Sequence, residues 1–164
     1  MQTIRIRDAT PSDAAVIAEF NLRMARETEG RRLDADVISA GVTAALEDAS
    51  NGRYWVAETE GAVVGQLMVT YEWSDWRNGR FWWIQSVYVR DDFRRKGVFS
   101  ALHRHVEALA LASEEVCGLR LYVERQNLRA QRTYEAMGLT SSGYEIMEVD
   151  FRKNSQRQTG RDGD

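Results

Sequence analysis

The chain alternates between stretches in which every second residue is apolar and stretches in which apolar residues recur every three or four positions. The first pattern predicts strands, and the second predicts helices with one apolar side. We expect strands at 4–7, 54–59, 62–71, 81–89 and 144–151, helices at about 10–28, 34–49 and 98–113, and a strand, a turn and a short helix over 121–139. This order of elements predicts a mixed α/β domain.

Turn and cap signals mark the borders of several elements. Thr10-Pro11-Ser12-Asp13 predicts a helix start, and Glu60-Gly61 predicts a hairpin turn. The strand at 81–89 is apolar on both faces, so we expect it inside the sheet. Residues 152–164 contain no apolar side chain. We therefore expect one domain over 1–151 and a polar, disordered tail over 152–164.

A cationic loop joins the strand at 81–89 to the helix that begins near residue 98. The first amides of a helix lack partners within the helix, and the peptide dipoles add partial positive charge there. Gly97 lets a ligand approach the backbone, and Arg94, Arg95 and Lys96 add charge nearby. These features predict a phosphate site, although an ordinary solvated loop has the same composition.

A second segment, residues 121–139, predicts a short helix with a polar and open face. Asn127 is expected to cap the start of this helix, and Gly138 is expected to end it. At helical spacing Asn127, Ala130 and Tyr134 share one face. The small side chain of Ala130 leaves room for a ligand between the other two.

Together, the two segments resemble the GNAT superfamily of N-acetyltransferases, which transfer an acetyl group from acetyl-coenzyme A to an amine. Arg94-Arg95-Lys96-Gly97-Val98-Phe99 is similar to the family's pyrophosphate loop, Arg/Gln-x-x-Gly-x-Gly/Ala. Asn127, Ala130, Tyr134 and Gly138-Leu139 are similar to its Asn-x-x-Ala-x-x-x-Tyr-x-x-x-Gly-Phe element. Phe99 departs from the pattern, so its side chain must point away from the phosphates.

The resemblance implies a single GNAT-like domain with a mixed central sheet of about six to seven strands and helices on both faces. It also implies acetyl-coenzyme A as the co-substrate, with no metal. The residues that it assigns to coenzyme binding are Val87, Tyr88, Val89, Arg94, Arg95, Lys96, Gly97, Val98, Phe99, Ser100, Asn127, Ala130 and Tyr134.

The implied reaction is direct attack of an amine on the thioester through a tetrahedral intermediate. By resemblance, the Val89 amide stabilises the oxyanion and the Tyr134 phenol protonates the departing thiolate. The strand at 81–89 offers Gln85 and Ser86 but no Asp or Glu, so we expect the amine to lose its proton through ordered water. A non-catalytic acyl-coenzyme A binding or regulatory module is the alternative, which Phe99 and the missing acid also fit.

The acceptor is expected to be a primary amine of a small molecule or a peptide. A carboxylate beside an aromatic wall attracts an ammonium group. The candidates for this role are Glu72, Trp73, Asp75, Gln85 and Glu27. A structural role is also open, because tryptophans on strands commonly pack in cores and these acids can solvate a hairpin or pair with Arg77.

Composition narrows the remaining classes. The chain has 164 residues and a net charge of −3, which suits one domain and argues against a general nucleic-acid binder. The single cysteine, Cys117, lies in an apolar run that predicts a buried, inert thiol. No apolar stretch approaches the ~20 residues of a membrane span, so we expect no membrane partner and a cytoplasmic location. Homodimer formation is an alternative that the sequence leaves open, since Met147, Val149 and Phe151 suit an interface as well as a core.

Overall fold

The computed structural model describes residues 3–152. The chain divides into two compact units, residues 1–124 and 125–164, and each is described by itself. The first unit contains β1 (Arg5–Asp8), α1 (Ala14–Glu29), α2 (Ala35–Glu47), β2 (Arg53–Thr59), β3 (Ala62–Ser74), β4 (Gly79–Val89), α3 (Val98–Leu111) and β5 (Val116–Leu121). The second unit contains α4 (Leu128–Ala136).

The strands of the first unit form one mixed sheet in the order β1-β2-β3-β4-β5. β1 to β4 are antiparallel neighbours, and β5 runs parallel to β4. The predicted hairpin turn is confirmed, because Glu60 and Gly61 both have positive φ, 51° and 77°. Positive φ at two central residues gives a turn whose twist matches that of the flanking strands.

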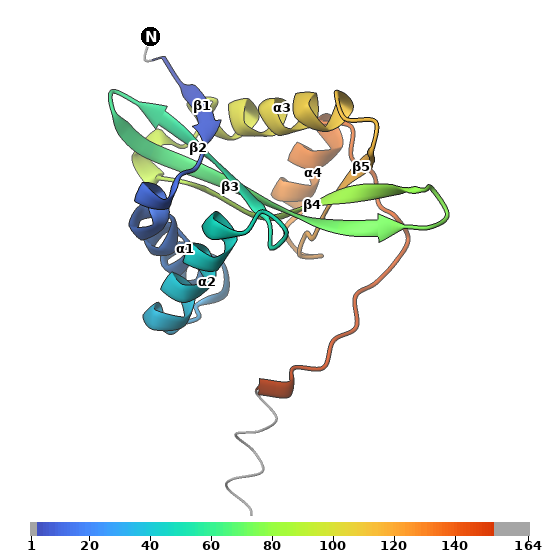
Figure 1. Cartoon of the computed structure of the whole chain (residues 1–164), viewed down its shortest axis with the longest axis horizontal. Helices are drawn as coiled ribbons and strands as arrows, with labels where there is room; N and C mark the ends of the chain where they lie inside the picture. The colour runs from blue at the N-terminus through green and yellow to red at the C-terminus, as the bar shows by residue number, and fades with distance from the viewer. Residues whose placement is uncertain (1–2, 153–164) are drawn as a thin grey trace, which may run out of the picture. The chain divides into compact units, whose positions relative to one another are not determined.

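Helices cover both faces of this sheet, as expected, with α1 and α2 on one face and α3 on the other (Figure 1). Each face has its own apolar cluster. The cluster beneath α3 consists of Trp55, Ala57, Val64, Leu67, Val69, Ile84, Val98, Leu102 and Val106. The cluster beneath α1 and α2 consists of Ile17, Ala18, Val42, Ala45, Tyr54 and Val56.

Polar side chains also fix α1 to the sheet. Arg7 on β1 binds the buried carboxylate of Asp13 just before α1, with Nη1 2.8 Å from Oδ2. Farther along α1, Asn21 Oδ1 accepts a 2.8 Å hydrogen bond from Nε2 of the fully buried Gln66 on β3. Since buried polar groups need partners, these contacts set the position of α1 and hence of its last turn.

Strand β4 changes its pairing partway along its length. Its register with β3 skips Gln85, because Val69 pairs with Ile84 while Met68 pairs with Ser86. Gln85 is therefore the extra residue of a β-bulge. The last β4 residue paired with β5 is Ile84, so the edge of β4 that faces β5 has no strand beside it over residues 85–89 of the first unit.

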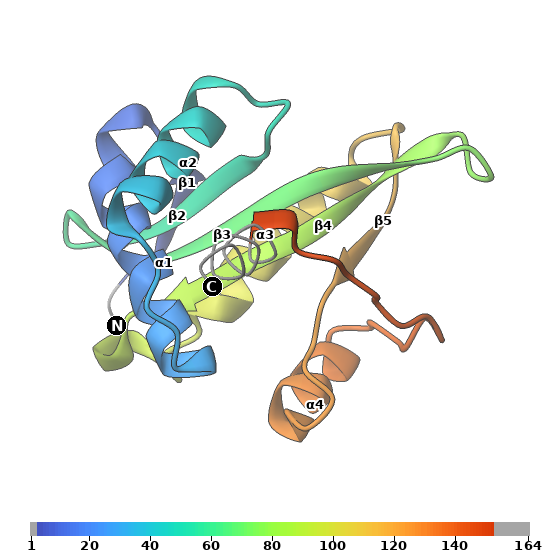
Figure 2. The same cartoon turned by 90° about the horizontal axis from the view of Figure 1, so that it is seen from below.

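The far end of the β3–β4 hairpin extends beyond α1 and α2 (Figure 2). Among the described residues of the first unit, no helix covers the sheet face of α1 and α2 along this part of the hairpin. Residues 73–79, expected as a polar loop or hairpin end, form the end of the hairpin, since β3 continues to Ser74 and β4 begins at Gly79.

In the second unit, α4 begins and ends as the sequence predicts. The Asn127 side chain accepts a 3.0 Å hydrogen bond from the Ala130 amide. At the other end, Gly138 has a φ of 90°, and the Gly138 and Leu139 amides donate to the carbonyls of Glu135 and Tyr134. This is the Schellman arrangement, which explains the glycine at this position.

Two expectations about regular structure and burial are wrong. Within residues 3–152 the sheet has five strands, and the strand expected at 144–151 is not formed. Alternation alone does not make a strand where no neighbouring strand pairs with it. Cys117 is exposed, and the pairing of β4 with β5 skips it, because Arg80 pairs with Val116 while Phe81 pairs with Gly118. Of the tail expected at 152–164, residues 153–164 lie outside the described residues, and the extent of the domain stays a prediction.

Candidate active site

The loop between β4 and α3 has the backbone of an anion-binding turn. Arg95 and Gly97 both have left-handed φ, 60° and 82°. The first amide bonded within α3 is that of Ala101, which donates to the Gly97 carbonyl over 3.0 Å. The amides of the residues between them point out of the helix start, where the dipole favours negative charge. An ideal Cβ on Gly97 meets nothing within 4 Å, so the space in front of this turn is open.

Arg94, the first cation of this loop, is held by neighbouring acids. Its guanidinium lies 2.5 Å from Glu27 in the last turn of α1 and 3.4 Å from Asp91. The Tyr88 hydroxyl donates to the other Glu27 oxygen over 3.0 Å. Burial, together with the Glu27 carboxylate, raises the pKa of Tyr88, which keeps it a donor. Glu27, expected near the acceptor, thus ties α1 to the loop.

The open edge of β4 presents backbone groups beside the same loop. The Arg90 amide donates to the Val64 carbonyl on β3, so residues 90 and 88 direct their backbone groups towards β3. Because this direction alternates along an antiparallel pair, Val87 and Val89 direct theirs to the opposite edge. The Val89 carbonyl there accepts a 2.9 Å hydrogen bond from Arg94 Nε. Arg94 therefore occupies the carbonyl of Val89, whereas the Val89 amide is directed away from β3.

Phe99 lies in the first turn of α3, and its ring lies 6.2 Å from the ring of His103 one turn later. The side chain is half-buried, as is that of Ser100, while Val98 is buried in the core. A bulky residue at position 99 is therefore accommodated along the helix.

The other assigned coenzyme residues belong to the second unit. Asn127 uses its side chain to cap α4, and Ala130 supplies the amide that it binds. Tyr134 is half-buried, and burial raises the pKa of its phenol. A raised pKa keeps a phenol protonated across the neutral range, which a proton donor requires.

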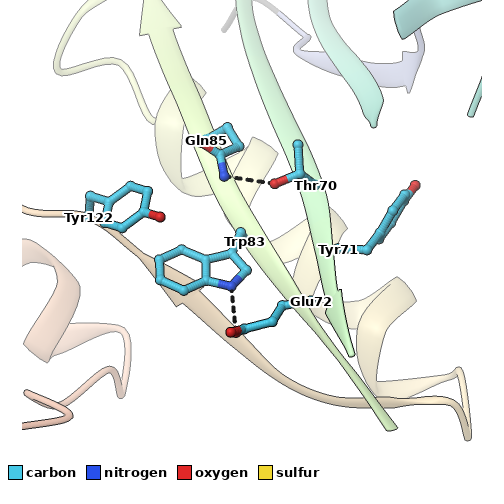
Figure 3. A pocket seen from close by; sticks show the side chains of 6 residues that line it. All are labelled: Thr70, Tyr71, Glu72, Trp83, Gln85 and Tyr122. Atoms are coloured by element: carbon cyan, nitrogen blue, oxygen red, sulfur yellow. Dashed lines mark hydrogen bonds between the residues drawn. The ribbon is translucent and has the colours of Figure 1, made fainter. Parts of the chain in front are cut away.

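A hollow of ≈ 230 Å³ lies on the β3–β4 hairpin. Its walls are formed by Thr70, Tyr71, Glu72, Trp83, Gln85 and Tyr122 (Figure 3). The rings of Trp83 and Tyr122 lie side by side, with centroids 4.5 Å apart and planes tilted by 36°. Gln85 Nε2 donates to Thr70 Oγ1 over 2.7 Å.

Glu72 is the only charged residue lining this hollow among the described residues. Its Oε2 accepts hydrogen bonds from Trp83 Nε1 at 2.9 Å and from Arg120 Nη1 at 2.7 Å. The Trp83 bond, followed by Arg120, holds the pKa of Glu72 below its usual range. The sequence left open a pair between Glu72 or Asp75 and Arg77, but the arginine that pairs with Glu72 is Arg120.

Only two of the five acceptor candidates line the hollow, namely Glu72 and Gln85. Trp73 and Asp75 lie exposed towards the end of the hairpin, where Asp75 Oδ1 accepts from the Trp76 amide. Sequence reasoning missed Thr70 and Tyr122. The alternation of side-chain direction along β3 and β4 could have indicated Thr70, because Thr70 and Trp83 are paired in register.

Two kinds of feature are absent from residues 3–152. No cluster of three His, Cys, Asp or Glu side chains there is placed to bind a metal ion. None of the helices in the same range has the length and apolar character needed to cross a bilayer.

Comparisons with known proteins bear on the family. Residues 17–139 match the model of the acetyltransferase (GNAT) family. A possible acetyltransferase from Clostridium difficile 630 is 46% identical, with a TM-score of 0.85 over 90% of this chain and 97% of that one. A ribosomal-protein-alanine N-acetyltransferase from Brucella melitensis biovar Abortus 2308 shares the fold at 20% identity, with a TM-score of 0.68 over 91% and 100% of the two chains. An aminoglycoside N-acetyltransferase in complex with CoA shares it at 14% identity, with a TM-score of 0.72 over 92% and 97%. No curated protein matches the sequence.

Proposed function

The chain belongs to the acetyltransferase (GNAT) family, and on that premise we propose that it transfers an acetyl group from acetyl-coenzyme A to a primary amine. The observation that carries the proposal is the open edge of β4, where Val87 and Val89 turn their backbone groups away from β3 beside the loop that precedes α3. An extended ligand with an amide-containing arm can pair with such an edge as a strand does. Its diphosphate then lies near the start of α3.

The residues of this region fit the coenzyme in charge and shape. The turn has left-handed backbone at Arg95 and Gly97, and the space in front of Gly97 is open. Arg95 and Lys96 are exposed and add positive charge beside the first amides of α3. Arg94 contributes less free charge, because Glu27 and Asp91 bind it, so its role is to hold the loop against β4.

The chemistry requires an oxyanion donor, a proton donor and a route for the amine proton. The amide of Val89 is our candidate to donate to the thioester oxygen, a contact typically worth ~3 kcal/mol of barrier. The amine nitrogen forms its bond to the carbonyl carbon, the carbon–sulfur bond breaks, and the sulfur takes a proton. The family motif assigns that proton to Tyr134.

The amine must lose a proton before it attacks. Gln85 and Ser86, the polar residues at the start of the open edge of β4, do not titrate in the neutral range. We propose that water carries the proton to solvent, which the exposure of Gln85 favours. The rate should then rise with pH along a single apparent pKa close to that of the bound amine.

The test is release of free thiol from acetyl-coenzyme A by the purified protein. A panel of amines covers polyamines, amino acids, aminoglycosides and short peptides, and mass spectrometry identifies the acetylated product. Thiol release with at least one acceptor supports the proposal. Binding of the coenzyme without turnover on any acceptor would instead favour a non-catalytic acyl-coenzyme A binding module.

A further inference from the structure

The hollow beside the open edge of β4 has the chemistry of a cation site. Trp83 and Tyr122 present neighbouring rings to it, Glu72 a carboxylate, Gln85 an amide and Thr70 a hydroxyl, whereas the Tyr71 ring packs against the cluster beneath α3. Arg120, which binds Glu72, is not one of the lining residues. Its guanidinium lies 3.7 Å from the centroid of the Phe81 ring and 6.0 Å from that of the Trp83 ring. A ligand in the hollow therefore meets π faces and oxygen acceptors.

Acceptor atoms in the hollow remain available to a ligand. The two protein donors to Glu72 both use Oε2, and among the contacts of the described residues Oε1 has no partner. Gln85 commits its Nε2 to Thr70, which leaves its carbonyl oxygen. A carboxylate oxygen, an amide oxygen and two neighbouring rings together bind an ammonium group by hydrogen bonds, charge and cation–π attraction.

The reacting nitrogen is not the group that suits this hollow. An amine must be neutral to attack a thioester, whereas a carboxylate with aromatic neighbours stabilises the ammonium form. The reaction also belongs at Val87 and Val89, whose backbone lies at the open edge. Trp83 is four residues before Val87 on the same strand, which is roughly 10 Å once the bulge is allowed for.

We propose that the hollow binds a second, non-reacting ammonium group of the acceptor, so that the preferred acceptors carry two cationic nitrogens roughly 10 Å apart. This inference rests on the proposed function, because the position of the reacting amine comes from it. Glu72 and the rings of Trp83 and Tyr122 are then residues that determine specificity. They touch the part of the acceptor remote from the acetyl group.

The test uses linear α,ω-diamines of increasing length and the monoamine of the same length for each. Binding is measured by titration calorimetry on the full chain without acetyl-coenzyme A, so that the result does not depend on turnover. We expect the diamine whose nitrogens are roughly 10 Å apart to bind at least tenfold more tightly than its monoamine. Shorter diamines should lose most of this advantage, because their second nitrogen cannot reach the hollow.

Variants identify the site. Glu72→Gln keeps an oxygen for Trp83 and Arg120 but removes the charge, so it should weaken binding of the long diamine at least tenfold, and it should also weaken binding of any monoamine whose ammonium enters the hollow. Tyr122→Leu, at an exposed residue, should weaken binding of the long diamine in part. Asp8→Asn is the matched control, since Asp8 is also a strand carboxylate paired with an arginine, 2.6 Å from Arg53. It should leave binding of the long diamine unchanged.

Two results overturn the inference. Equal affinity for diamines and monoamines in the unaltered protein would exclude a second ammonium site, and an unchanged diamine affinity in Glu72→Gln would exclude the hollow as that site. Neither result bears on acetyl transfer itself, which thiol release with the amine panel measures separately. Failure of thiol release alone would contradict the proposed function while the binding series still decides the cation site.

Discussion

Replacement of Gly97 with alanine separates backbone strain from ligand exclusion at the turn before α3. Gly97 has a φ of 82°, where an L residue costs ~1–2 kcal/mol relative to glycine. Part of that cost is offset, because alanine has about 0.4–1 kcal/mol less conformational entropy to lose on folding. No steric cost adds to it, since an ideal Cβ meets nothing within 4 Å. We expect Gly97→Ala to lower the free energy of unfolding by about 1 kcal/mol.

The chain provides a matched control for this variant. Gly61, in the β2–β3 turn, has a φ of 77° and also has nothing within 4 Å of an ideal Cβ. Gly61→Ala should therefore lose the same stability, which corresponds to ~2–4 °C in Tm per kcal/mol for a chain of this size. Denaturant titration and thermal melting of both variants without ligand measure this strain.

Coenzyme binding should distinguish the two glycines. If the diphosphate lies against the turn, the new methyl group of Gly97→Ala occupies its space, and we expect Kd for coenzyme A to rise at least tenfold, or about 1.4 kcal/mol. Gly61→Ala should change Kd less than twofold. Calorimetric titration with coenzyme A measures both values. An unchanged Kd in Gly97→Ala, at the expected loss of stability, would refute the placement of the diphosphate.

Three further predictions concern the ion pairs and the phenol. Arg7→Met leaves the Asp13 carboxylate buried without its partner and should cost about 3 kcal/mol of unfolding free energy at neutral pH. Because the hydrogen bond from Arg7 lowers the pKa of Asp13, that stability is present above the ordinary Asp pKa and is lost as pH falls through the lowered one, so the variant's penalty should shrink in acid melts. Glu27→Gln should change stability by less than ~1 kcal/mol, since the pair with Arg94 is exposed. It should also tighten coenzyme A binding severalfold at low salt by freeing Arg94, a gain that high salt must abolish. Tyr134→Phe should lower kcat by ~10²-fold or more and leave the Kd of coenzyme A unchanged, and equal losses in both would contradict the acid role.

The local parts of the fold were predictable because their signals lie in adjacent residues. The positive φ of Glu60 and Gly61 needs only a turn sequence between two alternating runs. The ends of α4 likewise depend on Asn127 and Gly138 within the helix itself. The expected strand at 144–151 failed for the complementary reason, because a strand needs a neighbour that alternation does not supply.

The site depends on contacts that local patterns do not encode. The hollow is lined by residues of β3 and β4 and by Tyr122, which follows β5, and the register places Thr70 opposite Trp83. The sequence pattern does not predict the bulge at Gln85, because a strand that is apolar on both faces shows no alternation for a bulge to interrupt. The partner of Arg94 lies 67 residues earlier in the chain, at Glu27. The cationic loop was therefore found from sequence, whereas the neutralisation of its first arginine was not.

Because one edge of β4 lacks a neighbouring strand of the first unit beyond Ile84, a ligand that hydrogen-bonds to this edge extends the hydrogen-bond ladder of the sheet. Up to Ile84 the strand has neighbours on both sides, and beyond it only β3 remains in the first unit. Amides of Val87 and Val89 should consequently exchange with deuterium faster than those of the preceding residues, and protection should appear when the donor is added. The bound donor then stabilises the folded chain as an added strand would. The free energy of unfolding should rise with the logarithm of the donor concentration.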